Sequence, residues 1–202
     1  LYSYLANGTI RRREWEATLA GREVWLSPVS VYELLEGLVQ ASVHTCPLSL
    51  AALAEAARVP DQRFLRLEGL EPGTLRRWLE AAGSELPADF QEFRARIDAG
   101  RREFLDRMRG FMGRVMPHYR RLGDPLFSSE WQAAAGRAPG EHLDAPFVFQ
   151  TAVLDRAMRI RYNPEKHPSD YLDYLQLRFL NQSDLTLVTA DQDLARLTSR
   201  SL

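Results

Sequence analysis

The fold expected for this chain depends on the stretch TLVTADQDL, residues Thr186–Leu194. Its first residues are β-branched or apolar, which is typical of a short buried strand that ends at Thr189. Asp191 and Asp193 follow directly. Asp193 has the position of an N-cap for a helix beginning at Leu194, whereas Asp191 would face the strand end. A simple turn is the alternative, but the pattern favours an α/β protein with its chemistry at a strand end.

The composition is that of an ordinary globular protein. The chain has 202 residues, of which 45% are hydrophobic and 26% are charged, and its net charge at pH 7 is −1. This length can bury a substantial core, and the small net charge gives no overall field that would attract a polyanion. The single cysteine excludes an internal disulfide and a cysteine zinc cluster, so we expect a cytoplasmic protein. No apolar run approaches the roughly 18 residues of a membrane helix, so no membrane span is expected.

A second strand-to-helix junction is expected near the N-terminus. EVWLSPVS (Glu23–Ser30) is short and apolar, which is typical of a buried strand that ends near its proline. VYELLEGLVQAS follows with helical periodicity. Ser30 has the position of an N-cap, and Glu33 lies three residues later, at the spacing of a capping box. Gly37 leaves open space one turn beyond Glu33.

Strands that alternate with helices indicate a parallel sheet with helices on its faces, so we expect an α/β fold in a single domain, residues 1–202. RFLRLEGL (Arg63–Leu70) is a further candidate strand. From about residue 71 to residue 161 the periodicity is helical, so this segment is expected to be a largely helical insertion. The chain opens in mid-pattern with LYSYLANG and ends with TSRSL. We therefore expect both termini to be truncated.

Carboxylates occur where burial would be unfavourable. The predicted helix SDYLDYLQLRFL is apolar almost all round, and Asp170 and Asp173 lie three residues apart on one of its faces. A buried carboxylate is costly unless it is paired or binds a cation. Asp170 also suits the first turn of a helix, whereas Asp173 has no such structural role, so we favour a function for Asp173. For Glu33 a capping role and a functional role stay equally open.

Acidic residues after two strands, together with an acid on the helix between them, can converge on one edge of a parallel sheet. Carboxylates without an accompanying lysine or histidine motif suit Mg²⁺ or Mn²⁺. One or two such ions activate water and stabilise the leaving oxygen in phosphodiester cleavage. The acids therefore indicate metal-dependent hydrolysis of a phosphodiester.

These segments resemble motifs of the PIN-domain nucleases. LSPVSVYELLEGL (residues 26–38) resembles the second acidic motif, and SDYLDYLQLRFLNQSDLTLVTADQDL (residues 169–194) resembles the third and fourth. The resemblance implies a Rossmann-like parallel sheet with flanking helices. It also implies an endoribonuclease that depends on Mg²⁺ or Mn²⁺ and cleaves RNA, as do many toxins of toxin–antitoxin pairs. An antitoxin or other protein partner, and a homodimer, are expected by the same analogy.

The resemblance also assigns roles to individual residues. It implies that the catalytic and metal-binding acids are Glu33, Asp173 and Asp191, with Thr189 as a nearby polar residue. Asp170 competes for the third position, and Asp193 competes for the fourth.

The sequence departs from the family pattern at both ends. The first acid of the family, an Asp at the end of the first strand, is not found in residues 1–202. LYSYLANG resembles the helix that follows it, so we expect this Asp just before Leu1 and a last strand after Leu202. Activity is therefore expected of the full-length protein. The alternative is a catalytically inactive PIN-like module whose helical insertion binds a protein partner.

Arginines are frequent in the expected insertion, with seven between Arg94 and Arg114 among several acids. A solvated face is the simpler interpretation of this mixture. The alternative is a surface that follows RNA phosphates, with Arg101 and Arg102 as contacts, because the planar guanidinium group suits phosphate.

Overall fold

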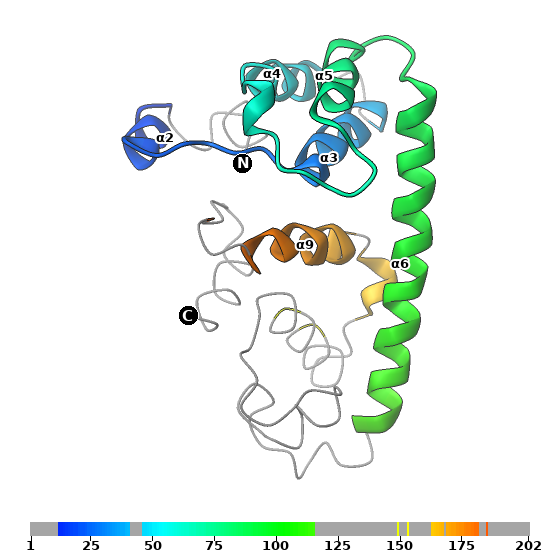
Figure 1. The fold of residues 1–202 in the computed structure, drawn as a ribbon. Coiled ribbons are helices and arrows are strands. Elements are labelled where there is room, and N and C mark those ends of the chain that lie inside the picture. The colour runs from blue at the N-terminus through cyan, green and yellow to red at the C-terminus, as the bar shows by residue number, and fades with distance from the viewer. Residues whose placement is uncertain are drawn as a thin grey trace. The chain divides into compact units, whose positions relative to one another are not determined.

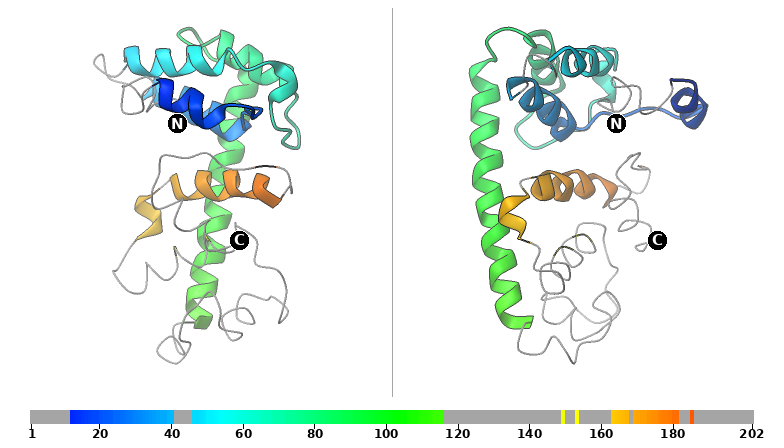
Figure 2. Two further views of the ribbon diagram at one scale, coloured as in Figure 1. Left: turned by 90° about the vertical axis from the view of Figure 1, so that its left-hand side faces the viewer. Right: turned by 180° about the vertical axis from the view of Figure 1, so that it is seen from behind.

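The structure is a computed structural model, and Figures 1 and 2 show its ribbon from three directions. It divides into two compact units, residues 1–95 and residues 96–202, which are described one after the other. The residues that the structure describes are 12–40, 46–115, 163–167 and 169–181, with residues 149, 153 and 185. No helix among them is long and apolar enough to cross a lipid bilayer.

The prediction of an α/β fold with a Rossmann-like parallel sheet is wrong. The described part of the chain is 72% helical and 4% strand, and it contains no sheet. Its β contacts are two isolated bridges, a parallel one between Leu26 and Phe64 and an antiparallel one between Leu67 and Leu70. The physical reason is that a short apolar run fits a buried strand and a buried helix equally well. Of the strand expected at Leu185–Thr189, residues 186–189 lie outside the described residues.

The segment predicted to be the N-terminal strand contains the start of a helix, α3 (Pro28–Val39). Ser27 has an extended backbone, with φ −79° and ψ 147°, and its side chain accepts a hydrogen bond from the backbone N–H of Ser30 at 3.0 Å. Pro28 follows in the first turn, where a backbone N–H has no acceptor within the helix, so the proline costs no hydrogen bond. Ser27 is therefore the N-cap, and Ser30 is not.

Within the predicted strand Glu23–Ser30, Leu26 is the described residue that forms a β bridge. Its N–H donates to the carbonyl oxygen of Arg63, and its carbonyl oxygen accepts from the N–H of Leu65, both at 2.9 Å. These two bonds form the parallel bridge, and they tie the start of α3 to the segment that follows η1 (Asp61–Arg63).

The first unit is a helical cluster. Besides α3 it contains α2 (Arg12–Leu19), α4 (Cys46–Ala56), α5 (Pro72–Glu80) and the first part of α6 (Ala88–Val115). α3 contacts both α4 and α5, and these helices lie side by side in both views of Figure 2. Trp78 is fully buried, and its ring lies 5.3 Å from Phe90 and 5.4 Å from Phe93, between centroids. Tyr32 of α3 stacks on Phe90 at 5.7 Å, so aromatic contacts join α3, α5 and α6.

Arg76 of α5 holds the end of α4. Its guanidinium donates to the carbonyl oxygens of Ala57 and Val59, which follow the last turn of α4, and its Nε donates to Oδ1 of Asp61 at 2.8 Å. The carbonyls at a helix end have no partner within the helix. The Arg76 guanidinium of α5 therefore provides hydrogen-bond donors to the carbonyl oxygens that follow the end of α4.

Asp89 joins α5 to the start of α6. It accepts hydrogen bonds from Nε1 of Trp78 at 2.7 Å and from Nη2 of Arg77 at 2.8 Å. Burial raises the pKa of the Asp89 carboxyl group, but the hydrogen bonds from Trp78 and Arg77 outweigh this effect and hold its pKa below the ordinary value of 3.8.

The lowered pKa of Asp89 predicts a pH dependence of stability. A carboxylate whose pKa is lower in the folded state stabilises that state above the unfolded pKa, and the contribution is lost as the pH falls through the folded pKa. Below about pH 4, we expect the free energy of unfolding to decrease less with falling pH in Asp89→Asn than in the parent protein. Urea unfolding of both proteins between pH 2 and pH 6 measures it. Parallel curves for the two proteins would contradict the assignment.

The second unit begins within α6 and includes η3 (Pro164–Lys166), α9 (Ser169–Leu177) and η4 (Arg178–Asn181). The helix expected over residues 169–180 is confirmed as α9 and η4. α6 has an apolar face that packs inward, because Phe104, Met108 and Phe111 are buried. The prediction of one domain with an insertion at about residues 71–161 stays a prediction.

Candidate functional site

α9 carries two of the predicted site acids. Asp170 lies in the first turn of the helix and is only 8% exposed, and its N–H donates to the carbonyl oxygen of His167 at 3.1 Å. Asp173 is half-buried one turn later on the same face. The sequence favoured Asp173, but Asp170 is the more deeply buried of the two. In the described part of the chain, Asp170 is the only charged residue in the buried class.

α9 lies close to α6 because position 100 of α6 has no side chain. A Cβ atom on Gly100 would lie 2.9 Å from Cζ of Tyr171 and still closer to its hydroxyl oxygen. The Tyr171 ring also lies 5.6 Å from Phe104, between centroids. Burial raises the pKa of the Tyr171 hydroxyl. Sequence reasoning missed this contact, which brings the helix bearing Asp170 and Asp173 against α6.

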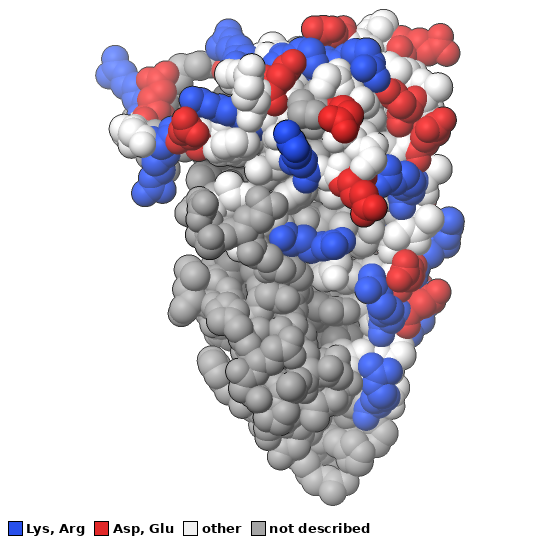
Figure 3. All heavy atoms as spheres, viewed as in Figure 1, with Lys and Arg blue, Asp and Glu red and all other residues white. Residues whose placement is uncertain are grey.

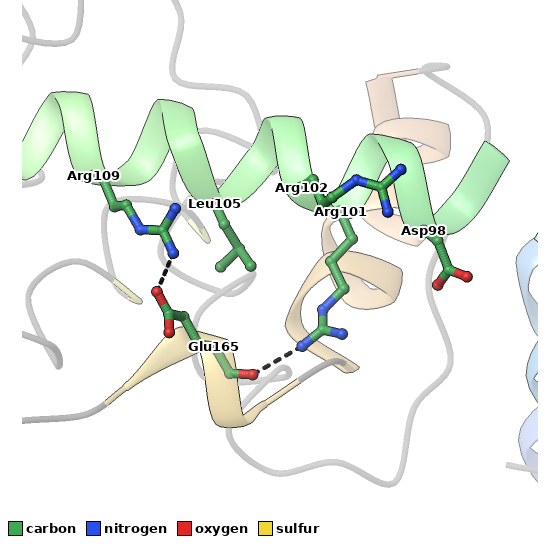
Figure 4. A pocket seen from close by; sticks show the side chains of 6 residues that line it. All are labelled: Asp98, Arg101, Arg102, Leu105, Arg109 and Glu165. Atoms are coloured by element: carbon green, nitrogen blue, oxygen red, sulfur yellow. Dashed lines mark hydrogen bonds and ion pairs between the residues drawn. The ribbon is translucent and has the colours of Figure 1, made fainter. Parts of the chain in front are cut away.

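Two arginines of α6 hold η3. Arg101 donates from Nη2 to the carbonyl oxygen of Glu165 at 2.9 Å, and Arg109 donates to the Glu165 carboxylate. Figure 4 shows Arg101 and Arg109 reaching Glu165 on either side of Leu105. Arg109 also donates to Oδ1 of Asp106 at 2.7 Å. The contact with Glu165 raises the pKa of the Arg109 guanidinium, so this residue stays fully charged.

Around this contact lies an open hollow of about 310 Å³. Its lining residues are Asp98, Arg101, Arg102, Leu105, Arg109 and Glu165. Sequence reasoning singled out Arg101 and Arg102 but missed Arg109 and Glu165. The spacing of four residues from Arg101 to Leu105 and on to Arg109 indicates a shared helix face, and this signal was present in the sequence.

Arg101 and Arg102 differ in their surroundings. Arg101 is half-buried and bonds a main-chain oxygen, whereas Arg102 is exposed and has no hydrogen bond or ion pair within the described residues. Figure 3 shows basic side chains along α6 with acidic side chains among them. Of the two predicted RNA contacts, only Arg102 therefore has a guanidinium group that makes no hydrogen bond to the part of the chain that the structure describes.

Glu33 lies on α3 in the first unit and is half-buried. One turn later Glu36 pairs with Arg94 at 2.9 Å and accepts from Gln40 at 3.3 Å, both through Oε1. Its Oε2 is buried and accepts no hydrogen bond from the described residues. A Cβ atom at Gly37 would meet no heavy atom within 4 Å, which confirms the open space expected there. Glu33 and the α9 acids belong to different units.

The α9 acids fit Mg²⁺ or Mn²⁺ by their chemistry, because both ions prefer carboxylate oxygens. Among the residues that the structure describes, however, no three His, Cys, Asp or Glu side chains form a group that could hold a metal ion. Thr189, Asp191 and Asp193 lie outside the described residues. The predicted acidic set is therefore placed only at Glu33, Asp170 and Asp173.

The chain matches no protein-family model, no curated protein and no solved structure.

Proposed function

We propose that the full-length protein is an endoribonuclease that depends on Mg²⁺ or Mn²⁺, of the kind implied by the resemblance to PIN-domain nucleases. The observation that supports this proposal is the placement of two carboxylates, Asp170 and Asp173, three residues apart on one face of α9. Mg²⁺ and Mn²⁺ prefer carboxylate oxygens, so such a pair suits either ion. α9 also precedes the stretch TLVTADQDL, which contributes Asp191.

In this proposal Asp173 and Asp191 of the second unit would hold the ion, with Asp170 as the alternative to Asp173 and Asp193 as the alternative to Asp191. Glu33, which the resemblance adds to this set, lies in the first unit and stays a prediction. A bound ion supplies an activated water and charge stabilisation at the leaving oxygen. Asp170 and Asp173 lie on one helix, α9, which packs closely against α6 where Gly100 meets Tyr171. Preorganisation of charged groups avoids the cost of arranging them during the reaction.

The proposed function also implies a substrate, a partner, an assembly and a location. RNA is the substrate, an antitoxin or another protein is the partner, and a homodimer is the expected assembly. The proposed location is the cytoplasm, because a chain with a single cysteine suits a reducing compartment.

The test uses the full-length protein and single-stranded RNA, in Mn²⁺ and in EDTA, beside an Asp191→Asn variant. We expect cleavage in Mn²⁺ only, and a rate for Asp191→Asn that falls to the level seen in EDTA. A circular-dichroism spectrum of the variant controls for folding. If the protein neither cleaves RNA nor binds Mn²⁺ in calorimetry, the proposal fails and the inactive module with a partner-binding helical region replaces it.

A further inference from the structure

The hollow between α6 and η3 combines arginine donors with a single acid that holds two of them. We propose that this hollow binds a backbone phosphate of single-stranded RNA, and that Glu165 occupies the anion position until RNA displaces it. The proposal rests on the ribonuclease function proposed above. It adds where the substrate strand lies on the protein and which residue competes with it.

Glu165 stands where a phosphate oxygen would be bound. A guanidinium group binds carboxylates and phosphates with the same planar set of donors, so the contact between Arg109 and the Glu165 carboxylate reproduces an arginine–phosphate contact. Both side chains are largely exposed, 59% for Arg109 and 51% for Glu165. Exposed ion pairs contribute little to stability, so displacement of Glu165 by a phosphate is not costly.

Positive charge remains available around Glu165. Arg101 bonds its main-chain oxygen, which carries no formal charge. Arg102 has no partner among the described residues, and Lys166, the neighbour of Glu165 in η3, is exposed. The lining of the hollow carries three arginines against the carboxylates of Glu165 and Asp98. Asp106 also pairs with Arg109, so the excess positive charge comes from Arg102 and Lys166.

The length of the arginine row favours a strand over an isolated phosphate. Arg101 and Arg109 are eight residues apart, which corresponds to about 12 Å along a helix axis. Glu165 reaches both because it offers its carboxylate to one and its main-chain oxygen to the other. A single phosphate has no second group of this kind, whereas RNA carries a phosphate at every nucleotide.

The experiment measures binding apart from cleavage. The full-length Asp191→Asn protein in EDTA is titrated into fluorescently labelled single-stranded RNA, and anisotropy gives Kd across a range of salt concentrations. We add Glu165→Gln, which keeps the main-chain oxygen but removes the competing charge. One additional phosphate contact should steepen the salt slope by about 0.7 and tighten Kd about fivefold at 0.1 M salt.

Two arginine variants complete the design. Arg102→Ala should make the salt slope shallower by about 0.7, because one phosphate contact is lost. Arg107→Ala is the matched control, since Arg107 is an exposed arginine of the same helix that pairs with Glu103 at 3.9 Å and does not line the hollow. Its slope should equal that of the parent.

Several outcomes overturn the proposal. It fails if no variant binds RNA, if Glu165→Gln leaves Kd unchanged or weakens it, or if Arg102→Ala behaves as Arg107→Ala does. Arg102 has no partner within the described residues, so its variant stays informative even if Glu165→Gln disturbs η3. Inorganic phosphate is compared with chloride at equal ionic strength, and selective displacement of RNA by phosphate would assign the hollow to the free anion. If the parent protein binds RNA but does not cleave it, the proposed ribonuclease activity fails and the proposed phosphate site stands.

Discussion

Trp78→Ala should lower the free energy of unfolding of the first unit by about 3–5 kcal/mol, the range for removal of a buried large aromatic side chain. Trp78 is fully buried, it contacts the rings of Phe90 and Phe93, and its Nε1–H is bonded to Asp89. The change would leave a cavity and remove a donor from a carboxylate. Since whole domains are stable by only about 5–15 kcal/mol, we expect a large shift of the urea midpoint.

Trp25→Ala is the matched control, because Trp25 lies in the same unit but is 42% exposed. A substitution at such a position should change stability by less than about 0.5 kcal/mol. Unfolding is followed by circular dichroism, so that the loss of a tryptophan does not alter the signal. Equal costs at positions 25 and 78 would contradict the core described here.

Asp173→Asn should remove Mn²⁺ binding from the full-length protein while its stability changes little. The substitution keeps the size of the side chain and removes the negative charge that a hard cation needs. Residues that merely orient a metal ligand cost 10–100-fold in affinity when they are replaced, so a ligand itself should cost at least about that much. Calorimetry measures the affinity, and thermal unfolding measures the stability.

Asp170→Asn is the comparison on the same helix. Asp170 lies in the first turn of α9, where a negative charge contributes about 0.3–1 kcal/mol, so its variant should lose stability in addition to any loss of metal. If Asp173→Asn lowers the melting temperature strongly and leaves Mn²⁺ affinity intact, Asp173 is structural. If only Asp170→Asn loses the metal, the two residues exchange the roles proposed for them.

Elements with a long periodic pattern were predictable from the sequence. The helical periodicity from about residue 71 to residue 161 predicted helical structure where α6 lies, and the pattern after Ser169 predicted α9. The segment from Glu23 to Ser30 was not predictable, because eight apolar-rich residues do not distinguish a strand from the approach to a helix. Strand formation also depends on partners elsewhere in the chain, and among the described residues Leu26 forms a single bridge, to Phe64.

The candidate site shows the same division. Asp170 and Asp173 were found because their spacing is local and their helix is apolar. Glu165 was missed because it meets Arg101 and Arg109 across 64 and 56 positions of sequence. No local pattern encodes such a pair. The sequence showed the spacing of four residues between Arg101, Leu105 and Arg109 on α6, but it did not show that Glu165 is their partner.

The close approach at Gly100 has a consequence for how this sequence varies among its descendants. A Cβ at position 100 meets the ring of Tyr171, so any larger residue at position 100 forces that ring to move. Substitution of Gly100 is therefore expected to be tolerated more readily when position 171 carries a smaller side chain.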